Sequence, residues 1–328
     1  MISIVIPLYN EDESLRPLYA EIVAATAAAD LPFEVVFVDD GSKDGSWEII
    51  ADLAKSDARV RGIRFRRNFG KAAALSAGFH AARGATIITL DADLQDDPRE
   101  IPRFLAEMDK GFDVVSGWKK KRLDPWHKTG PSKVFNYLVG RVTGVKLHDH
   151  NCGMKSYRAE IFREVRLYGE LHRFIPVLAA ARGWKVGEIA INHRERKFGS
   201  GKYMGVERFA KGFLDLLTVK FITGYGRRPA HLLGGLGMLS FAAGNVGLLI
   251  LAVTWIIENW ISPGHYKPIH ERALVYYSLA ALLLGAQMMS IGFLAELITA
   301  YQSRDTDSFS IKETTGEASG GRQPPEGG

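Results

Sequence analysis

The chain has 328 residues, a net charge of +5 and 46% hydrophobic residues. Its length allows one soluble domain of about 200–230 residues plus further segments. Its single cysteine, Cys152, excludes an internal disulfide and agrees with a reducing compartment. The positive charge is not accompanied by an aromatic-interleaved basic run or a recognisable nucleic-acid module, so contact with anionic lipid is favoured over binding to nucleic acid.

Short apolar runs of strand length alternate with helical patterns through the first half of the chain. The expected strands are Ile2–Ile6, Phe33–Val38, Val60–Phe65, Thr86–Leu90 and Phe112–Ser116. The expected helices begin after Glu11, at Ser46 and at Lys71. This alternation predicts an α/β fold with a parallel, doubly wound sheet and right-handed crossovers, in which ligands bind beyond the carboxyl ends of the strands.

Acidic residues follow two of these strands. Asp91 and Asp93 come after the run that ends at Leu90, and Gln95 follows them. Two carboxylates spaced in this way point to the same side and can share Mg²⁺ or Mn²⁺, with the Gln95 amide as a third oxygen ligand. An Asp-x-Asp pair also occurs in solvated turns, but its place at a strand end favours a metal site.

A second acidic pair, Asp39 and Asp40, ends the second strand, and a simple Asp-Gly turn is the alternative interpretation. In a nucleotide site one of these carboxylates would bind the base or the ribose. Pro7, Tyr9 and Glu11 at the end of the first strand offer a ring and polar groups for the same nucleotide.

Two basic stretches could bind phosphate. The loop from Arg196 to Lys202 combines glycines with an Arg and Lys residues, which suits a diphosphate; a basic loop near a membrane is the alternative. The run Lys119–Arg122, followed by Lys128, is a solvated charge run or a site for an acceptor phosphate.

The last third of the chain indicates a membrane anchor. No charged residue occurs between Leu232 and Ile257 or between Ala273 and Ala295, and each run exceeds the ~30 Å hydrocarbon core of a bilayer. An amphipathic pattern precedes the first run, and basic residues before it favour a cytoplasmic position of the large N-terminal domain. We expect a domain at 1–204, a juxtamembrane segment at 205–230, two spans within 231–300 (about 232–257 and 273–295) and a disordered polar tail at 301–328.

Taken together, these stretches resemble the family 2 glycosyltransferases, and within them the group of dolichol-phosphate mannose synthases and polyprenyl-phosphate glucosyltransferases. The resemblance covers about Ile2–Gly237 in the right order. Its motifs are Val5–Glu11, Val38–Ser42, Arg67–Lys71, Leu90–Asp96, Asp149–Lys155, His193–Tyr203 and Arg228–Gly234. The two C-terminal runs look more like the bacterial glucosyltransferase branch than like the single-span mannose synthases.

The resemblance implies a GT-A fold that uses a nucleotide sugar and Mg²⁺ or Mn²⁺. Asp91, Asp93 and Gln95 would hold the metal on the donor diphosphate, and Arg196 with Lys202 would cover that diphosphate. Lys119, Lys128 and Ser132 fall where the family binds the acceptor phosphate, and the first two replace the usual Arg. The implied nucleotide pocket contains Asp39 with Pro7, Tyr9 and Glu11.

The expected activity is inverting transfer of a sugar to a polyprenyl or dolichyl phosphate in a multi-pass protein of the cell membrane. Glucose from UDP-glucose is the leading donor, a UDP-sugar being favoured over a GDP-sugar; mannose, N-acetylglucosamine and galacturonate remain open. The alternatives are a processive polysaccharide synthase, whose Gln-x-x-Arg-Trp motif is absent, and a silent nucleotide-binding membrane module. Small residues in the spans make a homo-oligomer plausible.

Overall fold

The computed structural model of the protein describes residues 1–120, 126–165, 167, 171–194, 216, 218–219, 229–261 and 268–302. A seven-stranded sheet forms the centre of the N-terminal domain, in the order β3-β2-β1-β4-β6-β5-β7. The strands are β1 (Ile2–Leu8), β2 (Phe33–Asp39), β3 (Val60–Arg64), β4 (Thr86–Thr89), β5 (Val114–Lys119), β6 (Lys155–Arg158) and β7 (Val186–Ile191). All five strands expected between Ile2 and Ser116 are therefore present, with small shifts at their ends.

The sheet is mixed, whereas the sequence predicted a wholly parallel one. β1 to β4 pair in parallel, but β6 runs antiparallel between β4 and β5, and its first residue, Lys155, lies opposite both Thr89 and Ser116. β6 has only four residues, Lys-Ser-Tyr-Arg, so it has no apolar run by which a strand could be predicted. β7 returns to the parallel direction beside β5.

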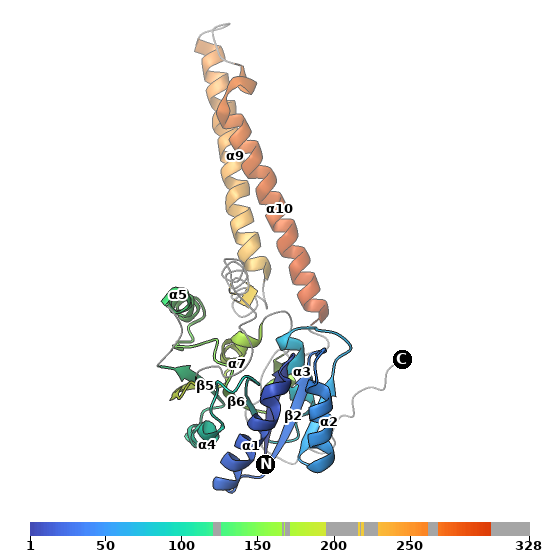
Figure 1. The fold of residues 1–328 in the computed structure, drawn as a ribbon. Helices are drawn as coiled ribbons and strands as arrows, with labels where there is room; N and C mark the ends of the chain where they lie inside the picture. The colour runs from blue at the N-terminus through green and yellow to red at the C-terminus, as the bar shows by residue number, and fades with distance from the viewer. Residues whose placement is uncertain are drawn as a thin grey trace, which may run out of the picture.

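Helices cover both faces of this sheet. The helices are α1 (Asp12–Ala28), α2 (Ser46–Ser56), α3 (Lys71–Ala81), α4 (Ile101–Asp109), α5 (Trp126–Thr143), α6 (Ile161–Glu164) and α7 (Ile175–Ala181), with 3₁₀ turns η1 (Pro98–Glu100) and η2 (Leu171–Phe174). Core residues of α1, α2 and α4 pack on one face, and those of α3, α5 and α7 pack on the other. The result is a three-layer α/β/α domain (Figure 1).

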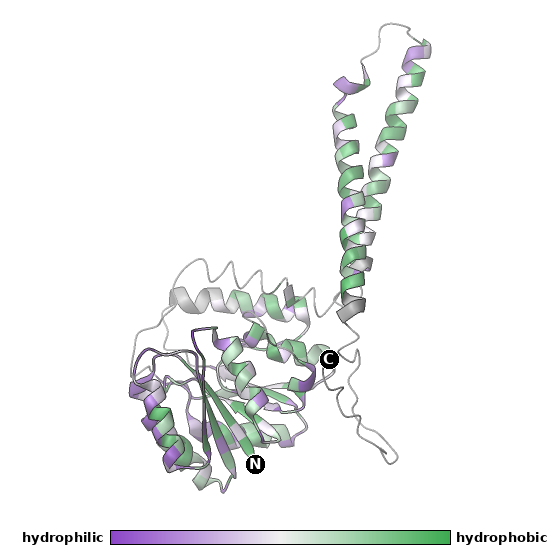
Figure 2. Ribbon diagram, turned by 90° about the vertical axis from the view of Figure 1, so that its right-hand side faces the viewer, coloured by the Kyte–Doolittle hydropathy of each residue, from purple (hydrophilic) through white to green (hydrophobic). Residues whose placement is uncertain are grey.

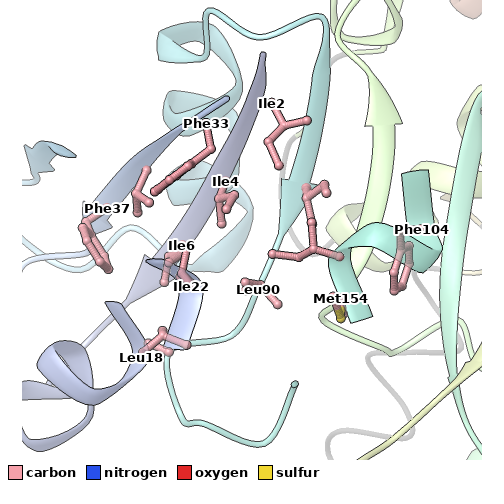
Figure 3. Close-up of a cluster of buried hydrophobic side chains, with 14 of the residues drawn as sticks. Ile2, Ile4, Ile6, Leu18, Ile22, Phe33, Phe37, Leu90, Phe104 and Met154 are labelled. Carbon is pink, nitrogen blue, oxygen red and sulfur yellow. The ribbon is translucent and has the colours of Figure 1, made fainter. Parts of the chain in front are cut away.

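The core follows from the period of the strands. Ile2, Ile4 and Ile6 of β1 point to the α1 side, and their neighbour Val5 points to the α3 side. Figure 3 shows the first of these clusters, in which Ile6 lies near Leu18 and Ile22 of α1. Because both faces of β1 and β2 are buried, these strands are fixed in register at the centre of the sheet.

Two long helices form a hairpin that extends away from this domain (Figures 1 and 2). They are α9 (Pro229–Ile261) and α10 (Ala273–Gln302), joined through a segment that includes the 3₁₀ turn η4 (Ile269–Glu271). Each contains a stretch long and apolar enough to cross a membrane, His231–Ile261 and Ala273–Ile298, and most of its side chains are not buried by protein. The expected spans at about 232–257 and 273–295 lie within these helices.

Most of the expected juxtamembrane segment at 205–230, and all of the tail beyond 302, lie outside the described residues. The two helices themselves pack closely. At Gly244 an added Cβ atom would lie 2.6 Å from the carbonyl oxygen of Ser278 and 2.7 Å from the backbone nitrogen of Leu282. The Ser240 hydroxyl donates to the carbonyl of Ala281 at 2.8 Å, so small and polar residues join the two backbones.

We predict that Gly244→Ala destabilises this hairpin, because its new methyl group would meet the backbone of α10. Overpacking of this kind typically costs ~1–3 kcal/mol. Gly234→Ala is the matched control, because nothing lies within 4 Å of a Cβ atom at that position of the same helix. Thermal unfolding of the purified protein in detergent should show a lower Tm for Gly244→Ala alone; equal Tm values would contradict the close packing.

Candidate active site

The residues singled out from the sequence gather at one edge of the sheet. The carboxyl ends of β1, β2, β4, β5 and β7 lie there, because these strands share one direction. The antiparallel β6 begins at the same edge. Consequently the loops after Leu8, Asp39 and Thr89, the end of β5 at Lys119 and the loop before Lys155 converge, as expected for a ligand site in an open α/β sheet.

The β1 and β2 ends are joined by hydrogen bonds between their loops. The Asn10 backbone N–H donates to the Ser42 hydroxyl at 2.9 Å, and the Lys43 N–H donates to the Asn10 side-chain oxygen at 2.8 Å. Asp39 is fully buried; its carboxylate accepts from the Ser42 N–H at 2.8 Å and lies 3.4 Å from Arg64 Nε. Tyr9 and Glu11 remain partly exposed beside it.

Asp40 is occupied by the protein itself. Its two carboxylate oxygens accept from the backbone N–H groups of Phe69 and Gly70 at 2.7 and 2.9 Å, which fixes the loop that leads into α3. Burial raises its pKa. Of the acidic pair, Asp40 thus supports the loop before α3, and Asp39 contacts Ser42 and Arg64.

Asp91 forms a close ion pair with Lys71, the first residue of α3. The Lys71 Nζ lies 2.5 Å from Asp91 Oδ1, and the two side chains are 37% and 28% exposed. Burial opposes ionisation of Asp91, but the charges of Lys71 and Lys119 outweigh it and lower the pKa of this carboxyl to about 2. The other side of the carboxylate faces Gly153, where an added Cβ atom would lie 2.2 Å from Oδ2.

Lys119 points inward rather than into solvent. Its Nζ lies 3.5 Å from Asp96 Oδ1, the lysine side chain is 15% exposed and the aspartate side chain is fully buried. Burial alone would lower the pKa of Lys119, but the negative charge of Asp96 outweighs burial and raises the pKa above its usual value. The ammonium is therefore ionised. The acidic segment after β4 and the basic end of β5 are therefore in electrostatic contact, which the sequence did not reveal.

A third lysine, Lys155 at the start of β6, is fully enclosed. Its Nζ donates to the carbonyl oxygens of His150 and Cys152 at 3.1 and 2.5 Å, and Thr89 donates its hydroxyl to the carbonyl of Gly153 at 2.7 Å. These bonds hold the loop that brings Gly153 against Asp91. Burial lowers the pKa of Lys155, with Asp149 and Asp91 acting in the opposite direction.

The chain after β7 is joined to the same acidic segment. Arg194 donates its backbone N–H to the carbonyl of Gln95 at 2.9 Å, and His193 forms a β-bridge with Asp96. The Arg194 guanidinium lies 2.6 Å from Asp97 and 2.6 Å from Glu21. The segment from Asp91 to Asp97 is therefore held between β4 and residues His193 and Arg194, which follow β7.

The donor set suits a hard divalent cation only in part. Among the described residues no group of three or more His, Cys, Asp or Glu side chains could hold a metal ion. Asp91 and Asp93, with Gln95, offer carboxylate and amide oxygens, which Mg²⁺ and Mn²⁺ prefer, and such ions usually take their remaining ligands from water or substrate phosphates. The residues therefore fit a metal that arrives with a phosphorylated ligand.

Several predicted site residues lie outside the described part of the chain. Arg196 and Lys202 belong to the segment 195–215, and Lys128 lies in α5 with its side chain undescribed. Ser132 is described and half-buried on the same helix. The sequence interpretation gave no role to Lys71, Asp96, Gly153 or Lys155; the only signal was their presence in the motifs Arg67–Lys71, Leu90–Asp96 and Asp149–Lys155.

Comparison with known proteins identifies the relatives of the chain. Residues 3–166 match the model of the family described as Glycosyl transferase family 2. A dodecaprenyl-phosphate galacturonate synthase of Rhizobium johnstonii is 38% identical over 312 residues, which cover 94% of this chain and 90% of that protein. An undecaprenyl-phosphate 4-deoxy-4-formamido-L-arabinose transferase of Aeromonas hydrophila is 34% identical, over 91% of this chain and 88% of that protein.

The fold is similar to that of solved glycosyltransferases. A glucosyl-3-phosphoglycerate synthase from Mycobacterium tuberculosis, solved with Mn²⁺ and UDP, superposes with a TM-score of 0.53 over 68% of this chain and 78% of that one. The two sequences are only 14% identical, so this likeness concerns the fold alone. It confirms the expected GT-A architecture.

We predict that Gly153→Ala abolishes most of the catalytic activity while the protein stays folded. The added methyl group would displace the Asp91 carboxylate, and a shift of about 1 Å at a reacting centre can cost ~10²-fold in rate. Gly140→Ala is the control, since the nearest atom to its Cβ would be 3.5 Å away. Turnover and circular dichroism of both variants test this; full activity of Gly153→Ala would show that the Asp91 position is unimportant.

Proposed function

Because the chain belongs to glycosyl transferase family 2, we propose that it transfers a sugar from a nucleotide diphosphate to a polyprenyl phosphate at the surface of a membrane. The observation that carries this proposal is the meeting of the acidic Asp91–Asp97 segment with Lys71 and Lys119 at one edge of the sheet. Support comes from relatives that act on polyprenyl phosphates and that match this chain through both long apolar helices.

The proposed chemistry follows from the charge of the acceptor. A phosphate monoester is largely ionised at neutral pH, since its second pKa is about 6, so its oxygen can attack the anomeric carbon of the sugar without a strong general base. The bond from that carbon to the nucleotide diphosphate breaks as the new bond forms on the opposite face, which inverts the anomeric centre. The protein must reduce the repulsion between two anions, and we assign this role to Lys119 and Lys71.

Within this mechanism the proposed site residues divide into four groups. Pro7, Tyr9, Glu11 and Asp39 are assigned to the nucleotide. Lys119, Lys128 and Ser132 are assigned to the acceptor phosphate, and Arg196 with Lys202 to the donor diphosphate. Asp91, Asp93 and Gln95 would hold a divalent cation, which when bound offsets the charge of the leaving diphosphate.

The comparisons do not support glucose as the transferred sugar. Glucose was expected, whereas the relatives described above carry galacturonate and 4-deoxy-4-formamido-L-arabinose in their names. We therefore propose a uronic acid, galacturonate, as the first donor to test, in its UDP-activated form. The catalytic domain is proposed to face the cytoplasm, and subunit number is left to experiment.

The identity of donor and acceptor can be tested in one assay of the purified protein in detergent. We expect product with UDP-galacturonate and undecaprenyl phosphate, and little product with undecaprenol, because the neutral alcohol lacks the ionised oxygen. UDP-glucose, UDP-N-acetylglucosamine and GDP-mannose serve as comparison donors. Equal rates with phosphate and alcohol would contradict the mechanism, and turnover only with another sugar would correct the donor.

We predict that Asp93→Asn reduces turnover by about 10²–10³-fold and that excess EDTA abolishes it, because charge on the leaving diphosphate would be left uncompensated. Asp109→Asn, at the end of α4 and distant in the chain from the acidic segment, is the control. A wild-type rate that is unchanged in EDTA would refute the metal assignment.

The role of Arg196 can be separated from simple attraction to lipid. We predict that Arg196→Lys lowers kcat/KM by about 10²-fold or more, since Lys cannot reproduce the two-pronged contact of a guanidinium with a diphosphate. The assay compares Arg196→Lys and Arg196→Ala in detergent and in anionic liposomes. If Arg196→Lys is near wild type in both, or Arg196→Ala loses only liposome binding, the loop serves the membrane.

A further inference from the structure

The cation that contacts Asp91 in the structure is a lysine of the protein. Lys71 Nζ lies 2.5 Å from Asp91 Oδ1, so one of the oxygens assigned to a divalent ion already has a positively charged partner. Both side chains are about one-third exposed, which leaves the pair accessible from the open edge of the sheet. The ammonium of Lys71 lies at the end of a flexible side chain, so it can move while the backbone of α3 stays in place.

Six charged groups interact around this pair, three of each sign. The acids are Asp91, Asp96 and Asp149, and the bases are Lys71, Lys119 and Lys155. We call this set the charge cluster. The charges of these six groups sum to zero, and the enclosure of Lys119, Asp96 and Lys155 makes an imbalance among them costly.

Balance determines which ligands the charge cluster accepts. A divalent cation alone would add two positive charges next to three lysines, and a diphosphate alone would add roughly two negative charges next to three aspartates. The two together add almost no net charge. The charge cluster therefore favours joint entry of metal and diphosphate over entry of either one.

We infer that Lys71 is the built-in counter-ion of Asp91, that a divalent cation replaces it there when the donor binds, and that the released ammonium then pairs with the donor diphosphate. This inference rests on the proposed function, since it assumes the metal and the nucleotide sugar. It adds a specific role for Lys71 and a physical reason for metal and nucleotide to bind together. No covalent bond is made or broken in the exchange; the hydrogen bond from Lys71 to the Asp91 carboxylate is replaced by coordination of the metal.

Mn²⁺ binding to the purified full-length protein tests the exchange without turnover. Electron paramagnetic resonance of free Mn²⁺ gives the affinity of wild type, Lys71→Met and Lys71→Arg in the absence of nucleotide. We expect Lys71→Met to bind Mn²⁺ about tenfold more tightly than wild type, because no charge-assisted hydrogen bond to Asp91 must be broken. Lys71→Arg keeps a cation and should stay close to wild type, and it serves as the folded comparison if Lys71→Met is unstable.

The second arm measures the affinity for UDP, or for GDP if UDP does not bind, at saturating Mn²⁺. Here Lys71→Met should bind the nucleotide about tenfold more weakly, because the released ammonium is missing. Lys110→Met is the control, since that lysine pairs with Glu107 on the surface of α4 and should change neither affinity. The opposite signs of the two effects distinguish the exchange from a general loss of structure.

A failure of the exchange at Asp91 can be distinguished from a failure of the proposed function. Suppose that wild type binds Mn²⁺ in the presence of nucleotide, but that in the absence of nucleotide Lys71→Met binds Mn²⁺ no more tightly than wild type does. The exchange is then refuted and the proposed function stands. If wild type binds no Mn²⁺ even with UDP or GDP, the metal assignment and the exchange are both refuted.

Discussion

The neutralisation of buried charge at one sheet edge is the constraint on which the rest of the domain depends. Asp96 and Lys155 are almost completely enclosed, and an enclosed ion without a counter-charge costs several kcal/mol. Asp91 and Asp96 after β4 have bases within reach, Lys71 of α3 and Lys119 of β5. Asp97 in the same segment pairs with Arg99 and with Arg194, which follows β7. These ion pairs link elements that are far apart in the sequence.

The mixed direction of the sheet serves the same requirement. Because β6 runs antiparallel between β4 and β5, its first residue, Lys155, lies at the edge where the parallel strands end. A parallel strand in the place of β6 would have its last residue, not its first, at this edge. The loop from His150 to Gly153, which precedes β6, would then lie at the opposite edge, away from Asp91. One reversed strand thus brings a second loop to the carboxyl ends.

Much of this arrangement could be predicted, and the limits have physical causes. The long apolar runs of β1 and β2 and the uncharged stretches of α9 and α10 carry a periodic or length signal, so their existence and order were predicted correctly. β6 has no such signal, since Lys155 and Arg158 bound only two residues and its burial comes from its neighbours. Asp91 was identified by its type and its position at a strand end, and Lys119 as part of a basic run and through the family resemblance. Their partners Lys71 and Asp96 were not, because pairing across a sheet depends on distances that a single sequence does not contain.

The position of the α9–α10 hairpin after the catalytic domain also governs how the protein is made. All seven strands of the described sheet precede Pro229, so the sheet is synthesised before the first long apolar helix. Domains generally fold as units in the order of synthesis, N-terminal first. The charge cluster can therefore assemble before the apolar hairpin, whose helices meet closely at Gly244 and Ser240, has been synthesised. Synthesis of the hairpin is in this sense a late event, which need not disturb an N-terminal domain that is already folded.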